Sequence, residues 1–142
     1  MREILFRGRC NEVGKYNGHW VEGHYGEDEG RNEIFFSTKI GIVGYSCEPE
    51  SIGQYTGLTD KNGKKIFEGD ILKIIHKYQS PFDDDTKEYT DITTDVVFFD
   101  DEGLCFSYGE SPFLCVADNV TAEYEVVGNI YDDNLEELAN GR

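Results

Sequence analysis

Two of the three histidines, His19 and His24, lie close to Glu22 in the sequence. Imidazole and carboxylate groups are common metal ligands. Side chains alternate between the two faces of a strand, so His19 and His24 point to opposite faces and only Glu22 shares a face with His24. A pair without a third converging ligand does not make a metal site. We therefore expect structural or surface roles for both histidines, and for His76, which has no obvious partner in the sequence.

Two further motifs resemble ligand loops without meeting their requirements. The three aspartates at 83–85 could attract a hard cation, but a calcium loop needs alternating ligands and a turn glycine, so we expect a solvated loop. Gly63 and Lys64 lack the G-x-x-x-x-G-K-S/T order of a phosphate loop, and no helix is expected after them. No Ser or Cys has an assignable base. The sequence therefore predicts a protein that is not an enzyme and has no cofactor or metal.

The four cysteines are Cys10, Cys47, Cys105 and Cys115. They show neither a C-x-x-C pair nor the dense spacing of a disulfide framework. Cys105 and Cys115 stand in short apolar stretches, as small core residues do. We interpret the cysteines as structural thiols of a protein in a reducing compartment.

The 142 residues are enough for one domain, or one domain with a small appendage, and for a proper core. No apolar run approaches the roughly 18–20 residues that span a bilayer. The first ten residues are too short and too interrupted for the apolar region of a signal peptide. These features predict a cytoplasmic protein without a membrane partner.

The formal net charge of −16 is unevenly distributed. Residues 1–81 carry 11 Lys and Arg against 12 Asp and Glu, a net charge of −1, whereas residues 82–142 carry 2 against 17, a net charge of −15. The negative charge of residues 82–142 disfavours direct binding to a phosphate backbone. These acidic residues either keep the protein in solution or form an acidic face for a basic partner, including a face that mimics nucleic acid.

Scattered turn residues between β-branched and aromatic runs predict a mainly β protein. Strands are expected over residues 3–7, 19–25, 34–36, 40–45, 71–75, 96–99, 104–108 and 123–131, the last with a bulge at Gly128. Asp133, with Glu136 three positions later, forms a capping box that predicts a short C-terminal helix ending near Asn140. The stretch 46–51, which contains Pro49, divides an N-terminal β segment (1–50) from a second part (51–142).

Three local patterns predict turns. Asn17-Gly18 and Asn62-Gly63 supply the positive φ of a tight turn. The run Glu68-Gly69-Asp70 bends the chain before an apolar strand, with Gly69 free to adopt a backbone angle closed to other residues and Asp70 able to bond nearby amides. Such a bend suits the corner of a small barrel.

Three segments together resemble the YopX family of phage and prophage proteins: "MREILFRGRC" leading to "GHWVEGHY", "IGQYTGLTDKNGKKIFEGDIL", and "YEVVGNIYDD" followed by an acidic helix. The resemblance covers nearly the whole chain in order. It implies viral origin and a mainly β fold with an SH3-type barrel or roll in the C-terminal part (51–142). It supplies no catalytic residues.

The central motif contributes the candidate site residues, which we interpret as structural: Gln54, Tyr55, Thr56, Gly57, Asp60, Gly63, Gly69 and Asp70. Tyr55, Thr56 and Asp60 are also candidates for the surface, together with Lys61, Lys64 and Lys65. These lysines either keep the hairpin in solution or contact a partner, such as the acidic face of another copy.

Two functions follow from these features. The first is a non-enzymatic protein-interaction module that binds a phage or host protein and forms homo-oligomers. The alternative is an acidic decoy that occupies a host DNA-binding protein. An enzyme ranks below both, because only Glu22 and His24 suggest one.

Overall fold

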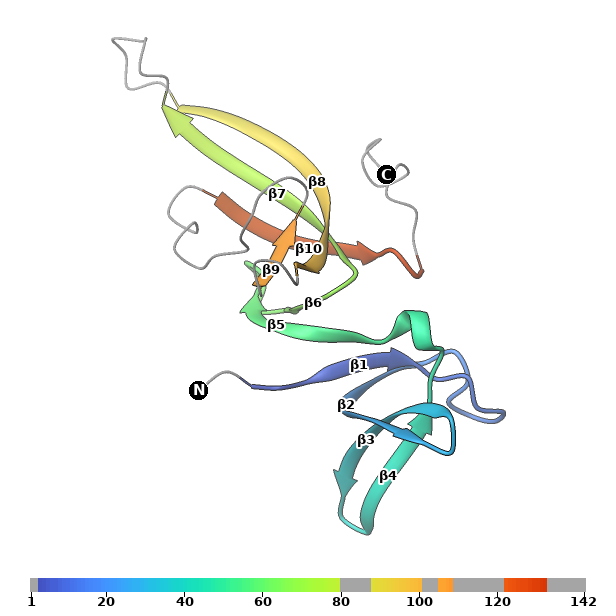
Figure 1. Cartoon of the computed structure of the whole chain (residues 1–142). Coiled ribbons are helices and arrows are strands. Elements are labelled where there is room, and N and C mark those ends of the chain that lie inside the picture. The colour runs from blue at the N-terminus through green and yellow to red at the C-terminus, as the bar shows by residue number, and fades with distance from the viewer. Residues whose placement is uncertain (1–2, 80–87, 101–104, 109–121, 133–142) are drawn as a thin grey trace. The chain divides into compact units, whose positions relative to one another are not determined.

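The computed structural model describes residues 3–79, 88–100, 105–108 and 122–132. Over these residues the chain is mainly β, with ten strands and one short 3-10 helix (Figure 1). The chain divides into two compact units, Met1–Gly57 and Leu58–Arg142. No helix in the described part of the chain is long and apolar enough to cross a membrane.

The first unit contributes the strands β4-β3-β2-β1-β5, in that order, to a six-stranded sheet whose last strand is β6 (Lys65–Phe67) of the second unit. Its elements are β1 (Phe6–Arg9), β2 (Trp20–Asp28), β3 (Arg31–Thr38), β4 (Gly41–Ser46), the 3-10 helix η1 (Pro49–Ser51) and β5 (Gly53–Thr59). Strand β5 crosses the unit boundary, and its last residues belong to the second unit.

A two-residue turn joins β2 to β3, where the sequence indicated only a polar loop. Glu29 and Gly30 have φ values of 50° and 78°, and Asp28 pairs with Arg31. Two consecutive positive φ values define a type I′ turn, whose twist matches that of the flanking strands. The predicted turn at Asn17-Gly18 is confirmed, because Gly18 has a φ of 83° and His19 N donates to Tyr16 O at 2.9 Å.

Two glycines of the first sheet, Gly26 and Gly44, leave room for the aromatic ring of Phe35. A Cβ at Gly26 would come within 2.8 Å of the Phe35 ring, and one at Gly44 within 2.7 Å. The Phe35 ring therefore packs over the backbones of β2 and β4, the strands on either side of β3. A side chain at Gly26 or Gly44 would push the ring away, so the two glycines allow its apolar area to be buried. The buried apolar residues of the first unit are Cys10, Ile34, Cys47 and Tyr55.

The unit boundary lies between Gly57 and Leu58, seven residues beyond the division at 50/51 that the sequence suggested. Hydrogen bonds tie the intervening residues to the first unit. Arg9 N donates to Ser51 Oγ at 2.8 Å, and Tyr55 N donates to Leu5 O at 2.7 Å. Residues around Pro49 therefore form a bend within the first unit.

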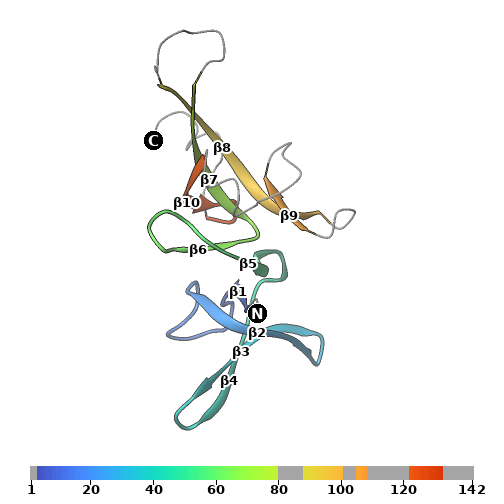
Figure 2. The ribbon, with the colours of Figure 1, turned by 90° about the vertical axis from the view of Figure 1, so that its left-hand side faces the viewer.

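The second unit contains a four-stranded antiparallel sheet with the order β10-β7-β8-β9 (Figure 2). The four strands of this sheet are β7 (Asp70–Gln79), β8 (Glu88–Asp100), β9 (Cys105–Tyr108) and β10 (Ala122–Asn129), and the unit also contains β6 (Lys65–Phe67) of the other sheet. Within the residues that the structure describes, neither sheet closes into a barrel.

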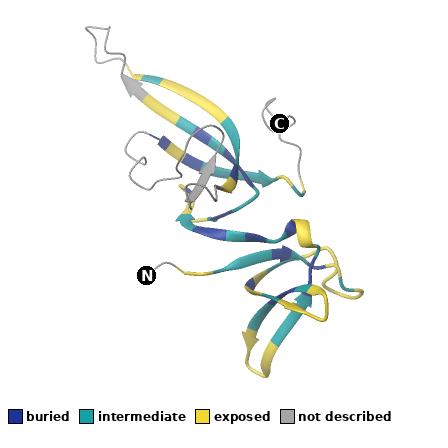
Figure 3. Cartoon of the chain, in the orientation of Figure 1, coloured by how far each residue is buried: buried dark blue, intermediate teal, exposed yellow. Residues whose placement is uncertain are grey.

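The core of the second unit is a cluster of six buried residues, packed against Leu58 and Val126 (Figure 3). They are Ile66, Leu72, Ile74, Val97, Ala122 and Tyr124. The cluster draws on β6, β7, β8 and β10, so these strands hold one another in place through the burial of apolar area.

Several expectations for the second half can be compared with the structure. The β8–β9 hairpin is confirmed, with Val97 opposite Tyr108. A register shift between Val126 and Gly128 confirms the bulge in β10. The turn at 101–104, the aspartates at 83–85, Cys115 and the expected helix from Asp133 lie outside the described residues.

Candidate functional site

The candidate site is the turn between β5 and β6, at the centre of the motif that the sequence singled out. Asp60 N donates to Lys64 O at 2.7 Å, and Gly63 N donates to Asp60 O at 3.0 Å. Gly63 has a φ of 82°, which confirms the turn predicted at Asn62-Gly63. The Asp60 Oδ1 atom accepts from Asn62 N at 2.8 Å and from Lys64 N at 2.9 Å. One carboxylate oxygen therefore fixes the whole turn.

The second carboxylate oxygen of Asp60 joins this turn to β10. Val126 N donates to Asp60 Oδ2 at 2.9 Å, and Lys61 N donates to Tyr124 O at 2.9 Å. Asp60 is 7% exposed. Burial acts to raise the pKa of the Asp60 carboxyl, but the hydrogen bonds from Val126, Lys64 and Asn62, with the charge of Lys64, hold that pKa below its usual value. Asp60 is therefore an ionised carboxylate that accepts three backbone hydrogen bonds.

Gly69 and Asp70 form the bend that the sequence predicted before β7, although neither described sheet closes into the barrel expected around it. Gly69 has a φ of 89°, its N–H donates to Val97 O at 2.8 Å, and its carbonyl oxygen accepts from Ile130 N at 2.9 Å. Asp70 is 1% exposed, and its Oδ2 accepts from Phe67 N at 2.7 Å. The corner thus links the start of β7 to β8 and to the end of β10, which is an architectural role.

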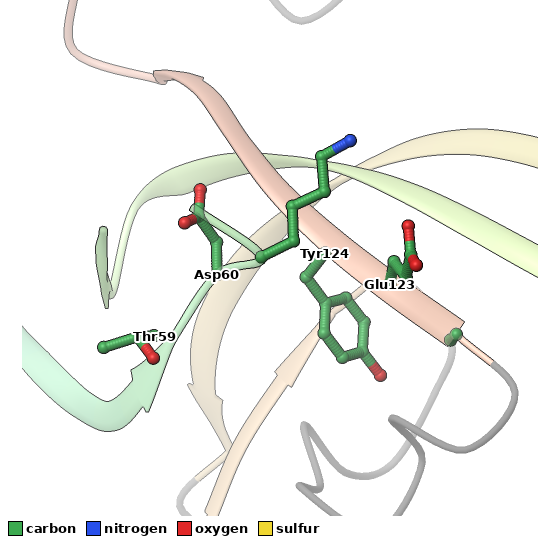
Figure 4. Close-up of a pocket in the computed structure, with 6 residues that line it drawn as sticks. Thr59, Asp60, Glu123 and Tyr124 are labelled. Atoms are coloured by element: carbon green, nitrogen blue, oxygen red, sulfur yellow. The ribbon is translucent and has the colours of Figure 1, made fainter. Parts of the chain in front are cut away.

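A hollow of about 280 Å³ lies beside the Asp60 turn (Figure 4). It is lined by Thr59, Asp60 and Lys61 from the end of β5 and the turn, and by Ala122, Glu123 and Tyr124 from β10. Because Asp60 is already coordinated, the groups that this hollow offers to a partner are the Lys61 side chain, the Thr59 hydroxyl and the exposed Glu123. A surface with both signs of charge suits a polypeptide better than a phosphate.

The three lysines of the turn differ in their surroundings. Lys61 Nζ lies 3.7 Å from Glu125 Oε2, with side-chain exposures of 38% and 30%. Lys64 is exposed, and its charge acts on Asp60. Lys65 is half-buried on β6. The exposed basic surface of the turn therefore consists of Lys61 and Lys64.

Three of the expected surface candidates, Tyr55, Thr56 and Asp60, are wrong as surface residues. Tyr55 and Thr56 are each 6% exposed, because β5 lies between its neighbours in the sheet. Gln54 pairs with Phe6 of β1, and Gly57 has a φ of 89°. The four residues 54–57 therefore belong to the interior strand of the first unit, and the structure does not bring them into the Asp60 turn.

The histidines that the sequence considered do not converge on a metal site. His19 lies against the ring of Tyr16, with centroids 6.1 Å apart, and His24 is an exposed residue of β2. Across the described ranges there is no group of three or more His, Cys, Asp and Glu residues that could hold a metal ion.

Sequence reasoning missed the β10 residues that complete the site. Val126 is 66 positions from Asp60, and its contribution is a backbone N–H that any residue but proline would supply. It also missed the aromatic row on the first unit, in which Tyr45 lies 5.2 Å from Tyr16 and 5.6 Å from Phe36, centroid to centroid. Neither arrangement leaves a local signal in the sequence.

Comparisons with known proteins identify the family. The model of the YopX protein family matches residues 6–136, nearly the whole chain. Among solved structures, the protein is similar to EF1440 from Enterococcus faecalis, with 21% identity over 93% of this chain and 96% of that chain and a TM-score of 0.49. None of the curated proteins compared with this chain matches it. The match of the family model to so much of the sequence shows that the chain belongs to the YopX protein family.

Proposed function

We propose that this protein is a non-enzymatic interaction module that binds a phage or host protein through the Asp60 turn. The observation that carries the proposal is the three-point attachment of the turn to β10, by Asp60 Oδ2, Lys61 N and the Lys61–Glu125 ion pair. A turn that is already ordered loses little conformational freedom when it binds, and this preorganisation favours affinity.

The chemistry of the turn favours a protein partner. Lys61 and Lys64 offer positive charge beside the exposed carboxylate of Glu123. Opposite charges at close range select a partner and its orientation more than they add affinity. The partner surface we infer is an acidic segment with a nearby basic group. A second copy of this chain meets that description, so homo-oligomer formation is part of the proposal.

Charge reversal at Lys64 tests the proposal. Lys64→Glu should weaken capture of the partner strongly and lower the melting temperature only slightly, because the Lys64 side chain is exposed although its charge acts on Asp60. Lys77→Glu is the matched control, since Lys77 is an exposed lysine of β7 in the same unit. Equal capture by Lys64→Glu and by the unchanged chain would exclude the turn as the binding surface.

Three wider expectations accompany this proposal. The second unit is an SH3-like roll, supported by the Gly69 corner and by the single cluster that packs β6, β7, β8 and β10 together. The protein has phage or prophage origin and acts in the cytoplasm of the host. Direct binding of nucleic acid is disfavoured, because residues 58–142 carry 7 Lys and Arg against 20 Asp and Glu, a net charge of −13.

The charge of the second unit also supports the alternative, an acidic decoy of a host DNA-binding protein. Carboxylates on β8 and β10, namely Glu88, Asp91 and Glu123, are exposed on one continuous sheet. A decoy predicts a basic partner whose binding falls steeply with salt and is displaced by duplex DNA. Binding that DNA does not displace would exclude the decoy and leave the interaction module.

A further inference from the structure

Cys10 and Cys47 face each other across the first unit. They form an isolated antiparallel bridge between the residue after β1 and the residue after β4. Asn11 N donates to Ser46 O at 3.0 Å on one side of the pair, and Glu48 N donates to Arg9 O at 3.0 Å on the other. The two cysteines are therefore a non-hydrogen-bonded pair, in which Cα atoms are about 4.5 Å apart and side chains share a face.

This geometry falls within the range of a disulfide, whose Cα atoms are usually about 4.4–6.8 Å apart. Both residues are free thiols, with Cys10 2% and Cys47 1% exposed. A Cβ at Gly8 would lie 2.9 Å from Cys47 Cβ and 3.0 Å from its Sγ, so Gly8 leaves the space that the Cys47 side chain occupies. Burial, followed by the neighbouring Cys10, raises the pKa of the Cys47 thiol to about 11, so oxidation at neutral pH is slow.

We propose that Cys10 and Cys47 form a reversible redox pair, which a low-molecular-weight disulfide such as oxidised glutathione converts to an intramolecular disulfide. One cysteine attacks the glutathione disulfide, forms a mixed disulfide and releases one glutathione thiol. The second cysteine then attacks the protein sulfur of the mixed disulfide and releases the other glutathione. The two cysteine hydrogens end on the two glutathione thiols, so the pair is oxidised by two electrons and glutathione is reduced by two.

The bond would join the residue after β1 to the residue after β4 and close a loop that contains β2, β3 and β4. Closing this loop restricts the unfolded chain and stabilises the first unit. Cβ atoms of cross-strand neighbours are about 4.5–5.5 Å apart and lie at the short end of this range in a non-hydrogen-bonded pair, next to the roughly 3.5–4.5 Å found in disulfides.

Mass spectrometry of the full chain tests the pairing. The folded protein is held in glutathione buffers from reducing to oxidising, alkylated and digested with trypsin. Cleavage after Arg9, Lys15, Lys39 and Lys61 places Cys10 in peptide 10–15 and Cys47 in peptide 40–61, whereas Cys105 and Cys115 share peptide 88–142. We expect peptides 10–15 and 40–61 to be linked in oxidising buffer and released by reductant.

A stability measurement distinguishes the Cys10–Cys47 disulfide from incidental oxidation of the chain. The oxidised chain should unfold roughly 10 °C higher than the reduced chain, as monitored by fluorescence of Trp20, the single tryptophan. In Cys47→Ser the same oxidation should leave the unfolding midpoint unchanged. Three results would overturn the proposal: glutathione adducts in place of the link, a link that forms only in denaturant, or an oxidised chain that is no more stable than the reduced one.

Discussion

Replacement of Asp60 by alanine should destabilise the second unit by about 2.5–4 kcal/mol. The substitution removes the acceptor of three backbone N–H groups at 2.8–2.9 Å from a carboxylate that is 7% exposed. The bond to Val126 contributes about 1.5–3 kcal/mol, since hydrogen bonds to charged groups are among the stronger ones. Asn62 and Lys64 are exposed, so water can accept hydrogen bonds from their N–H groups after the substitution. The loss of these two bonds to Asp60 therefore costs only about 1 kcal/mol.

Asparagine at the same position distinguishes the contributions that the two carboxylate oxygens of Asp60 make to stability. Its amide oxygen can retain the bonds to Asn62 N and Lys64 N, but its NH₂ group would then face Val126 N–H, and two donors cannot pair. We therefore expect Asp60→Asn to lose about 2–3 kcal/mol, less than alanine but far more than a neutral surface change.

Urea denaturation followed by far-UV circular dichroism measures both changes. Asp91→Ala is the matched control, because Asp91 is an exposed aspartate of β8 in the same unit and should change stability by less than about 0.5 kcal/mol. If Asp60→Ala lowered the free energy of unfolding by less than about 1 kcal/mol, Asp60 would not be the residue that holds the turn in place. Asp60→Asn equal in stability to the unchanged chain would refute the contribution of the bond to Val126.

The pH dependence of Asp60 has a defined sign. Its folded pKa lies below the value of 3.8 that the carboxyl has in an unfolded chain. The unfolded chain therefore takes up a proton first as the pH falls, so the stabilisation is present above pH 3.8 and is lost at lower pH. As the pH is lowered, the free energy of unfolding should fall less steeply in Asp60→Ala than in the unchanged chain. Equal slopes of the free energy against pH would contradict this linkage.

Three further predictions concern the rest of the chain. Gly23→Ala should cost about 2–4 kcal/mol in urea denaturation followed by Trp20 fluorescence, because a Cβ there would overlap the carbonyl oxygen of Phe35; a loss below about 0.5 kcal/mol would contradict this. Lys61→Ala should change stability by less than about 1 kcal/mol in the same denaturation, since its ion pair with Glu125 is solvated, and a larger loss would count against that description. Because burial raises the Cys47 pKa from 9.0 to about 11, stability should fall as the pH rises through that range, and the fall should be shallower in Cys47→Ser.

The sequence predicted those parts of the fold that depend on local chemistry. Gly18, Gly63 and Gly69 each adopt the positive φ that their neighbours suggested, and Gly128 marks the bulge of β10. Such features follow from the allowed backbone angles of a few adjacent residues. The type I′ turn at Glu29-Gly30 was missed because a glutamate at φ 50° is uncommon.

Features that depend on long-range pairing were not predictable. Strand β5 was not predicted, since only its pairing with β1 makes residues 53–59 extended. The start of β8 was not predicted either, because its exposed residues, such as Asp91, show no apolar alternation. The candidate site shows the same limit, for Asp60 was identified but its partner on β10 was not.

The most direct test of the account is capture of the binding partner from host lysate, with and without phage proteins, by the unchanged chain, by a Lys61→Ala/Lys64→Ala double variant and by Lys77→Ala. Each capture is washed at low and high salt and challenged with duplex DNA. The account predicts one protein that the unchanged chain and Lys77→Ala retain, that the double variant loses at an unchanged melting temperature, and that DNA does not displace. A partner captured equally by all three chains, or released by DNA, would contradict it.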